Sequence, residues 1–586
     1  LSILLIALFM LGCEDFLTRN PLDTISDTPE FWNNEDNLRT YTVGLYDQYF
    51  EGWRSGWSRT DWFAETNIAD WNDDNAQRAA TFFTKVTPAT DATNWNFVNL
   101  RRVNILVDRA QKSGLPDEAK NHWVGIGRFL RALEYFKLVS KYGDVPWFDA
   151  PIESTDMEML YKERQPRATV MDFVAEDLEF ACNNIRLSDG AAGLTINRDV
   201  ALAYTSRVML FEGTWQKYME NNTANATKYL NIAKDAASKI ISDGKYSLIK
   251  DYKSLTTSIS LKGNPEIILY REYEESILMH SLMAFQNTEF QGSSPSRSLI
   301  DTYLSKNGLP IGQEENDQFK GDKWFYDEIA DRDPRLYAII DTTGLRLEGI
   351  ATVYAVSGYY ANRFVNETLI DKPGGKSSTN ITDAPVMKLN EVLMNYIEAA
   401  AELSTMGAYT LKQSDFDITI NTLRDRTSTS MPHVMLAGNN LSVGGTIVND
   451  PLRDADVPSI IWEIRRERRT ELAYEGIRFN DIRRWGKLDY ADMILNPRLN
   501  MGAWLDKPRY VTWYNENKKP SIPLTLEDLD GILLDRAGNE GYIKPIQDPS
   551  FMRTYSEKDY LYPIPADQIT LYKTKDVTLT QNPGWN

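Results

Sequence analysis

The chain contains very little cysteine and histidine: 586 residues include 2 cysteines and 3 histidines. So few cysteines cannot supply a disulfide framework, and stability must come from a packed core. His122, His280 and His433 are far apart in the sequence, which argues against a histidine-rich metal site and against a Ser-His catalytic triad. We therefore expect no metal and no cofactor. With 42% apolar and 25% charged residues, the composition is that of a globular protein with a large core.

Positive charge is scarce relative to negative charge. The 64 Lys and Arg residues are outnumbered by 83 Asp and Glu residues, and the formal net charge is −19. A surface of this charge repels phosphate backbones, which argues against nucleic acid as a partner.

Long hydrophobic runs are scarce too. The first twelve residues, LSILLIALFMLG, are nearly all apolar but stop at Cys13, whereas a membrane-spanning helix needs about 20 residues. The run fits the apolar region of a signal peptide, and LFMLGC matches the lipobox pattern, in which the cysteine is lipidated and becomes the mature N-terminus. We expect residues 1–12 to be a truncated lipoprotein signal peptide and Cys13 to carry the lipid that anchors the protein to a membrane. A buried N-terminal strand is the alternative. If Cys13 carries the lipid, Cys182 is the one remaining thiol; it lies on the apolar face of a predicted helix, and we expect it to be buried.

Helical periodicity dominates the two ends of the chain. Apolar residues recur every three or four positions in a series of segments, namely 35–50, 96–112, 117–142, 167–186, 198–220, 225–243, 386–407, 414–428 and 457–475. Between about 251 and 380 the pattern changes to short apolar runs broken by Gly, Pro, Asn and Ser, which predicts a loop-rich region with occasional strands. The tail, 490–586, shows little periodicity. Helix pairs of about 34 to 40 residues suggest stacked hairpins of tetratricopeptide type.

The stretch IIWEIRRERRTELAYEGIRFNDIRRWGKL, residues 460–488, is rich in arginine. Glutamates are interleaved with the arginines: Glu463 and Arg466 are three residues apart, as are Arg468 and Glu471, so each pair shares a helix face. We therefore favour a helix crossed by salt bridges and packed inside the fold over a nucleic-acid-binding patch. Glu471 and Arg478 are expected to be structural.

Within this stretch, RRERRTELAYEGIRFNDIRRWGKL resembles the C-terminal signature of the SusD/RagB family, the surface glycan-binding lipoproteins of Bacteroidetes. Further stretches resemble other landmarks of the family in the right order and span the whole chain: CEDFLTRNPLDTISDTPEFW, RALEYFKLVSKYGDVPW, MKLNEVLMNYIEAAAEL, YPIPADQI and LTQNPGWN.

This resemblance implies a mostly α fold, in which four tetratricopeptide-like helix pairs form a scaffold and a loop-rich, strand-poor lobe packs on it. After the signal peptide it implies an N-terminal region with helix pairs, 13–250, and a C-terminal region with the lobe and the final helix pairs, 251–586. It also implies a protein that is not an enzyme. Such a protein is lipid-anchored at the cell surface in the outer membrane, binds oligosaccharides and delivers them to a partner TonB-dependent (SusC-like) transporter. Binding residues in this family vary with the glycan and must be argued from this chain.

Tryptophan is concentrated between residues 53 and 95, where five of the 15 tryptophans fall. Exposed indole rings stack on the C–H faces of sugars, and Asn and Asp bind the hydroxyls. In TDWFAETNIADWNDDN, Trp71 is our candidate stacking platform, with Asn67, Asp70 and Asn72 as hydroxyl partners. Trp62 and Trp95 are further candidates. The alternative, that these rings anchor a loop to the scaffold, stays open. The same stretch lacks the Gly and Glu of an EF-hand loop, which leaves an irregular calcium site as a minor alternative.

The loop-rich middle region offers a second candidate surface. It contains Phe290, Gln291, Trp324, Tyr359, Tyr360 and Arg363 on or near loops, although packing would explain each of them equally well. Two other functions remain open: a glycoside hydrolase with paired carboxylates, and a helical-repeat adaptor that binds no sugar.

Overall fold

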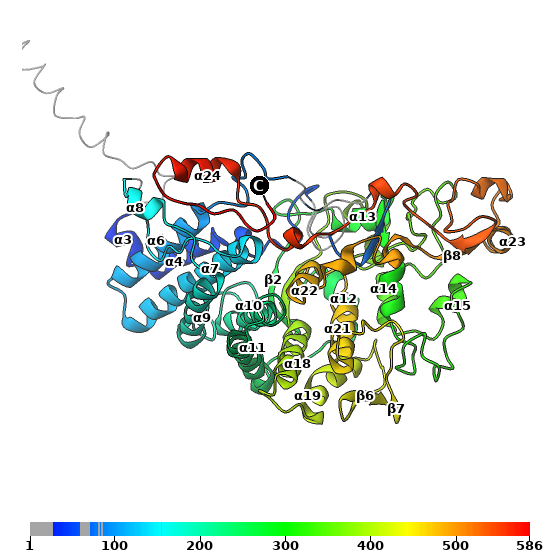
Figure 1. Ribbon diagram of the computed structural model, residues 1–586, viewed down its shortest axis with the longest axis horizontal. Coiled ribbons are helices and arrows are strands. Elements are labelled where there is room, and N and C mark those ends of the chain that lie inside the picture. The colour runs from blue at the N-terminus through cyan, green and yellow to red at the C-terminus, as the bar shows by residue number, and fades with distance from the viewer. Residues whose placement is uncertain (1–26, 59–70, 80–82, 84–85, 154, 586) are drawn as a thin grey trace, which may run out of the picture.

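The computed structural model describes residues 27–58, 71–79, 83, 86–153 and 155–585. Helices dominate these residues and the sheets are small (Figure 1). Cys13, Trp62, Asn67 and Asp70 lie outside the described residues. No helix within the described part of the chain is both long and apolar enough to cross a membrane.

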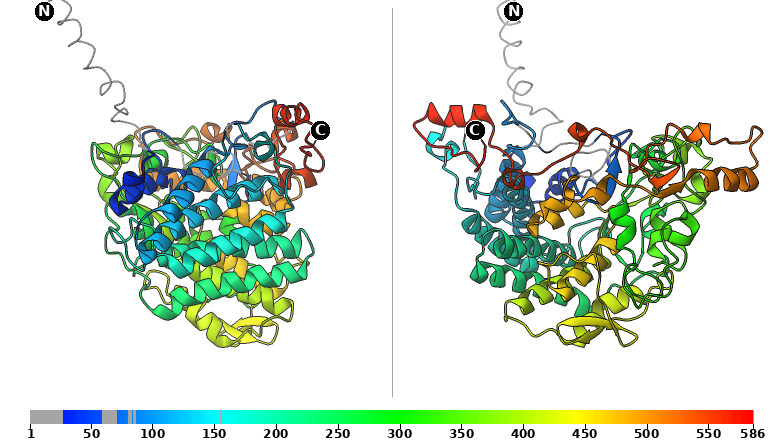
Figure 2. Two further views of the ribbon diagram at one scale, coloured as in Figure 1. Left: turned by 90° about the vertical axis from the view of Figure 1, so that its left-hand side faces the viewer. Right: turned by 45° about the vertical axis from the view of Figure 1, so that its right-hand side comes forward.

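A row of long helices forms the scaffold. These are α6 (Val98–Lys112), α7 (Asp117–Tyr142), α9 (Arg167–Asn184), α10 (Arg198–Tyr218), α11 (Thr223–Asp243), α18 (Leu389–Thr405) and α21 (Ser459–Glu471). Each helix packs on the next one in this order, and the row can be followed from the left to the centre of Figure 1 and face-on in the left panel of Figure 2. The predicted mostly α fold with a helix-pair scaffold is confirmed.

The ends of the scaffold helices follow from local chemistry. Helix α7 has the predicted bounds, because Gly143 adopts a φ of 72° that a side chain would disfavour and its N–H bonds to the carbonyl of Val139 at 2.9 Å. Helix α11 begins at an Asn222 cap and ends at Gly244, which has a left-handed φ of 62°. Helices α10 and α11 approach closely because Gly213 has no side chain: a Cβ there would lie 2.6 Å from Leu230 Cγ.

The sheets are short and antiparallel. Their strands pair as β1 (Asn75–Gln77) with β3 (Ser293–Pro295), β2 (Ile267–Arg271) with β4 (Ala384–Lys388), β5 (Met435–Ala437) with β6 (Asn440–Val443), β6 with β7 (Thr446–Ile447), and β8 (Trp504–Asp506) with β9 (Glu540–Tyr542). The shorter helices include α4 (Glu35–Val43), α13 (Leu282–Asn287), α14 (Arg297–Thr302), α15 (Phe325–Ile329), α16 (Arg335–Ile339) and α22 (Arg478–Arg484). Many of them belong to the loop-rich lobe on the right of Figure 1, which has its own apolar core.

Several segments differ from the periodicity-based predictions. The helix expected at 386–407 begins at Leu389, because strand β4 occupies the residues before it. The helix expected at 414–428 is interrupted by a π-helical segment, Asp417–Asn421. In the tail, α23 (Lys507–Lys518) and α24 (Ala566–Lys573) were not predicted. The apolar residues of these two helices form no clear stripe. The start of α23 is marked instead by the Asp506 carboxylate, which caps the helix by accepting the N–H of Arg509 at 3.0 Å.

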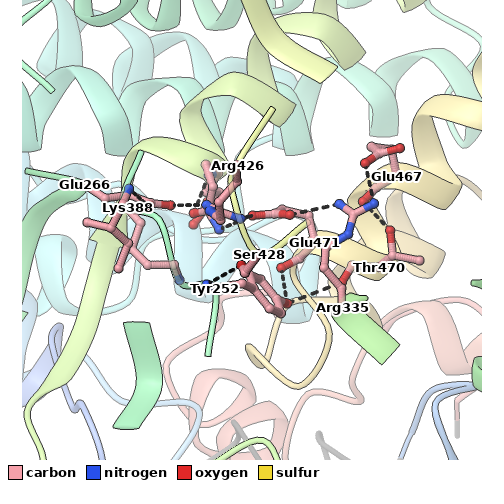
Figure 3. A network of polar contacts seen from close by, with 12 residues as sticks. Tyr252, Glu266, Arg335, Lys388, Arg426, Ser428, Glu467, Thr470 and Glu471 are labelled. Carbon is pink, nitrogen blue, oxygen red and sulfur yellow. Dashed lines mark hydrogen bonds and ion pairs between the residues drawn. The ribbon is translucent and has the colours of Figure 1, made fainter. Parts of the chain in front are cut away.

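Buried charge pairs tie helix α21 to its surroundings, as expected for Glu471 (Figure 3). Arg335 donates to Glu471 at 2.9 Å and pairs with Glu467 at 2.7 Å, and Arg426 pairs with Glu471 at 2.7 Å and with Glu266 at 2.6 Å. Burial raises the pKa of Glu467, but Arg335 and Arg424 outweigh it and hold this pKa at about 2. Buried Arg–Glu ion pairs therefore fix helix α21 to the segments around it.

Two of the smaller sequence predictions have clear outcomes. The pair Glu463–Arg466 is present, at 2.7 Å. Arg468 does not pair with Glu471 as expected, because it turns to Asp481, at 2.8 Å, on helix α22. Cys182 is a buried free thiol, as predicted.

Candidate functional site

An exposed aromatic ring stacked on a partly buried one stands out on the loop-rich lobe. Phe290 follows helix α13 and is 48% exposed. Its ring lies nearly parallel to the ring of Tyr354, with centroids 5.5 Å apart and planes 27° apart. The two rings form an offset stack, which we call the aromatic platform.

Charged groups border the aromatic platform. The guanidinium of Arg78 lies 5.9 Å from the ring centroid of Phe290 and 5.8 Å from that of Tyr354. Arg78 also forms an ion pair with Glu348, which accepts a hydrogen bond from the Tyr354 hydroxyl at 3.2 Å. Both charged side chains are about half exposed, so the platform combines flat apolar faces with free hydrogen-bonding capacity at its border.

Three segments far apart in the sequence meet to build the platform. Strand β1 pairs with β3, and Arg78 N–H continues the pairing to the Gly292 carbonyl at 2.9 Å. On the other side, Gln291 N–H bonds to the Tyr354 carbonyl at 2.7 Å. The backbone of residues 290–292 therefore lies between the other two segments and fixes the relative positions of the side chains.

Buried side chains hold the platform from below. The amide of Gln291 is clamped to the backbone of Ala361, accepting its N–H at 2.8 Å and donating to its carbonyl at 3.2 Å. Tyr360 donates its hydroxyl to the Glu289 carbonyl at 2.9 Å. These two sequence candidates are buried, so they support the platform rather than touch a ligand.

A second exposed aromatic group lies at Trp57, which is 53% exposed. Its ring packs edge-on against Phe285 of helix α13, with centroids 5.9 Å apart. The preceding residue, Gly56, forms a backbone bridge with His280, just before α13. Trp57 therefore packs against helix α13, and Phe290 lies in the loop that follows the same helix.

The prediction that Trp71 is a stacking platform is wrong. Trp71 is 5% exposed, and its ring packs against Phe83 at 5.2 Å and Phe479 at 5.7 Å. Asn72 is also buried, and its side chain accepts the N–H of Asp74 at 2.8 Å, which stabilises the turn. Neither side chain presents a free face or a free polar group to a sugar.

Arginines from the C-terminal part of the chain explain why this polar loop is buried. Arg478 binds Asp73 through two nitrogens, at 2.7 and 2.9 Å, and Arg469 binds Asp74 at 2.8 Å. Burial raises the pKa of Asp73, but Arg469 and Arg478 outweigh it and bring this pKa to about 2. The expected structural role of Arg478 is supported by these contacts.

The remaining sequence candidates are also occupied by packing. Trp95 lies edge-on against Tyr142 at 4.9 Å in the main core. Tyr359 is buried and donates its hydroxyl to Glu328 at 2.8 Å, and Arg363 is buried against Glu475 and the ring of Tyr252. Trp324 is half-buried, with the guanidinium of Arg509 4.2 Å from its ring centroid.

Of the twelve candidates, Phe290 is therefore the described side chain that the structure places in an exposed, ligand-accessible setting. Arg78, Glu348, Tyr354 and Trp57 were missed. A large aromatic residue between acidic and amide residues, as in EFQG at 289–292, is the sequence signal that points to Phe290. No comparable local signal marks Tyr354. Within the described ranges, no group of three or more His, Cys, Asp or Glu side chains is arranged to hold a metal ion.

Comparison with known proteins identifies the family. The model of the SusD family matches residues 281–585, just over half of the chain, which include Phe290, Glu348 and Tyr354 but not Arg78. The chain belongs to the SusD family. This confirms the resemblance inferred from the sequence motifs.

Curated relatives come from Formosa agariphila. The SusD-family chain is 26% identical to SusD-like protein P2 over 407 residues, which cover 64% of this chain and 68% of the relative. It is also 26% identical to SusD-like protein P25 over 187 residues, 29% of this chain and 34% of that relative. The matched part is therefore about a third of the length of P25.

Solved structures share the fold. A SusD-like carbohydrate-binding protein from Bacteroides fragilis superimposes with a TM-score of 0.62 at 21% identity, covering 92% of this chain and 99% of that one. A laminarin-binding SusD-like protein gives a TM-score of 0.53 at 18% identity, covering 94% of this chain and 100% of that one. At these identities the likeness establishes a SusD-like fold.

Proposed function

We propose that this SusD-family protein is a cell-surface lipoprotein that binds an oligosaccharide at the aromatic platform and delivers it to a TonB-dependent outer-membrane transporter without hydrolysing it. The observation that carries the proposal is the exposed ring of Phe290, stacked nearly parallel on the partly buried ring of Tyr354 and bordered by Arg78 and Glu348.

The chemistry of the platform suits a sugar ring. A pyranose has a flat C–H face, which stacks on an aromatic ring, and a border of hydroxyls, which both donate and accept hydrogen bonds. Arg78 can donate to a hydroxyl oxygen and Glu348 can accept from a hydroxyl, because both side chains are half exposed. Their ion pair also keeps both groups close to the rings before a ligand arrives, which lowers the ordering cost of binding.

Membership of the SusD family supports the same function. Two solved structures with this fold are described as a carbohydrate-binding and a laminarin-binding protein. The exposed ring of Trp57 provides a second stacking surface near α13 for a ligand longer than one sugar.

Calorimetric titration of the purified protein with a panel of neutral α- and β-glucan oligosaccharides tests the binding step. For the glycan that binds, Phe290→Ala should weaken affinity by at least about tenfold, or 1.4 kcal/mol, at an unchanged melting temperature. The matched control is Phe551→Ala, because Phe551 is a similarly exposed phenylalanine, 53% against 48%, outside the platform. Full affinity in Phe290→Ala would exclude the platform as the site. Release of new reducing ends from the bound glycan would contradict a non-enzymatic role.

The anchoring and delivery steps need separate experiments. Stable attachment to a membrane needs more than one acyl chain, as a bacterial lipoprotein carries, so Cys13→Ala should release a folded protein from washed membranes. Retention of the variant there would argue against Cys13 as the anchor. Co-purification of the wild-type protein with an outer-membrane barrel from gently solubilised membranes tests the proposed partner.

A further inference from the structure

A cavity lies on the opposite side of helix α21 from the buried ion pairs of Figure 3. It has a volume of about 510 Å³, within the range of about 300 to 1,000 Å³ that is usual for small-ligand sites. Helix α21 turns one face toward it, because Trp462, Arg465, Arg466 and Arg469 follow one another at spacings of three, one and three residues. None of the aromatic platform residues lines this cavity.

The walls combine aromatic rings with guanidinium groups. Trp462, Trp485 and Tyr490 supply flat apolar surfaces. The guanidinium of Arg465 contacts two rings, with its Cζ 4.3 Å from the centroid of Trp485 and 5.1 Å from that of Tyr218. Contact with aromatic rings restrains the planar guanidinium group.

Arg465 has hydrogen-bonding capacity that its neighbours do not use. The side chain is buried, yet its Nε has no hydrogen-bond partner among the described residues. Its contact with a carboxylate is a single one, to Glu402 at 3.2 Å. A buried donor without a partner costs free energy, so the fold holds Arg465 with a donor that no described residue satisfies.

The charges around Arg465 do not balance. Glu402 is shared with Lys217, which binds it more closely, at 2.5 Å. The neighbouring ion pairs of Arg468 and Arg484 with Glu398 and Asp481 form a separate, balanced group. Glu402, Lys217 and Arg465 form a cluster of two cations and one carboxylate. Within the described residues, this cluster thus has one more cation than carboxylates, and Arg465 is its member on the cavity wall.

Five aspartates and five arginines line the cavity, so its wall is formally neutral as a whole and the excess of positive charge is local to Arg465. Asp73 is bound by Arg478, and Asp450 is bound by Arg466 at 2.7 Å and by the Trp462 indole N–H at 2.8 Å. Asp489 forms no ion pair with a described residue, and burial raises its pKa. Its carboxyl group is therefore available to accept a hydrogen bond from a hydroxyl.

We propose that this cavity is a second binding site, which takes a small acidic sugar of one or two rings with its carboxylate on Arg465. The aromatic walls would contact the ring faces, and Asp489 would bind a hydroxyl. The proposal does not depend on the aromatic platform, and the two sites can be tested independently.

Titration with glucuronate, glucose and acetate tests the proposed ligand class. Glucuronate and glucose share a ring and differ by the carboxylate, whereas acetate has the carboxylate without the ring. Glucuronate should bind at least about tenfold more tightly than either of the others. Equal binding of glucose, equal binding of acetate, or no binding of glucuronate at millimolar concentration would each overturn the proposal.

Variants locate the site. Arg465→Gln should weaken glucuronate binding by at least about tenfold. Because Arg465 is buried, a second pair of variants avoids the interior: Leu495 lines the cavity and is 64% exposed, so it can accept a charge without unfolding the protein. Leu495→Glu should weaken glucuronate binding and Leu495→Lys should strengthen it, with glucose unaffected. Indifference of glucuronate to both substitutions would overturn the site, and loss of its binding in Phe290→Ala would move it to the platform.

Discussion

The ring of Phe290 lies 5.5 Å from the ring of Tyr354 at an angle of 27°, although the two residues are 64 positions apart in the sequence. The backbone hydrogen bond from Gln291 N–H to the Tyr354 carbonyl fixes this arrangement. The platform is thus built before a ligand binds, and its two rings are not interchangeable: Phe290 offers only a ring, whereas Tyr354 also holds Glu348 through its hydroxyl.

Substitutions at Tyr354 should separate these two contributions. Tyr354→Ala removes the ring and should weaken glycan binding by at least about tenfold. Tyr354→Phe keeps the ring and removes the hydrogen bond to Glu348. It should therefore lower the free energy of glycan binding by only about 0.5 to 1.5 kcal/mol. Titration of both variants with the same glycan measures the difference. Equal losses would mean that the hydroxyl, not the ring, determines binding.

Trp71→Ala should behave as a core substitution. Removing a buried tryptophan costs about 3 to 5 kcal/mol of unfolding free energy, and Trp71 packs against Phe83, Phe479 and Tyr562. Denaturant unfolding measures the loss, and titration of the protein that remains folded should give the wild-type affinity. A stable variant with weakened glycan binding would restore Trp71 as a ligand-binding residue.

The long helices could be predicted because their signal is local. Helix α7 begins and ends where apolar periodicity, Gly143 and Pro146 place it. The site could not be predicted in the same way. Residues 60–75 lack helix and strand periodicity, which suggested an exposed loop, but the partners that bury Asp73 and Asp74 are Arg478 and Arg469, about 400 residues later. Likewise, the platform joins Arg78, Phe290 and Tyr354 through backbone pairing between separate segments. Distant pairing of this kind leaves no trace in a local pattern.

Glu471→Gln should be strongly destabilising. Glu471 is fully buried between Arg335 and Arg426, and removing one partner of a buried ion pair costs about 3 to 5 kcal/mol because charge is left uncompensated. The matched control is Asp371→Asn, which breaks the exposed pair with Lys376 and should cost less than about 1 kcal/mol. Both values come from denaturant unfolding. Glycan affinity of the folded Glu471→Gln protein should be unchanged, and similar stabilities of the two variants would contradict a structural role for the network.

His280 should make the protein less stable in mild acid. Its ring is buried beside Tyr273 and Trp53, its Nδ1 accepts the N–H of Leu282 at 3.2 Å, and its Nε2 lies 3.0 Å from the Thr382 carbonyl. This arrangement fits the neutral ring with a proton on Nε2. Burial lowers the pKa of His280 to about 3, against an opposing contribution from the hydrogen bond to Thr382.

The sign of the effect follows from proton binding. The unfolded chain takes up a proton at His280 below about pH 6.5, whereas the folded protein does not. The contribution of neutral His280 to the unfolding free energy is therefore complete above pH 6.5 and is lost as the pH falls toward 3. At pH 5 the loss from this residue is about 2 kcal/mol. In His280→Gln, the difference in unfolding free energy between pH 7 and pH 5 should therefore be smaller than in the wild type by about this amount.

His122, whose pKa is lowered to about 4 by burial, should act in the same direction, so the double variant with His122→Gln should flatten the profile further. Superimposable pH profiles of wild type and His280→Gln would show that the folded protein does accommodate a charged ring at this position.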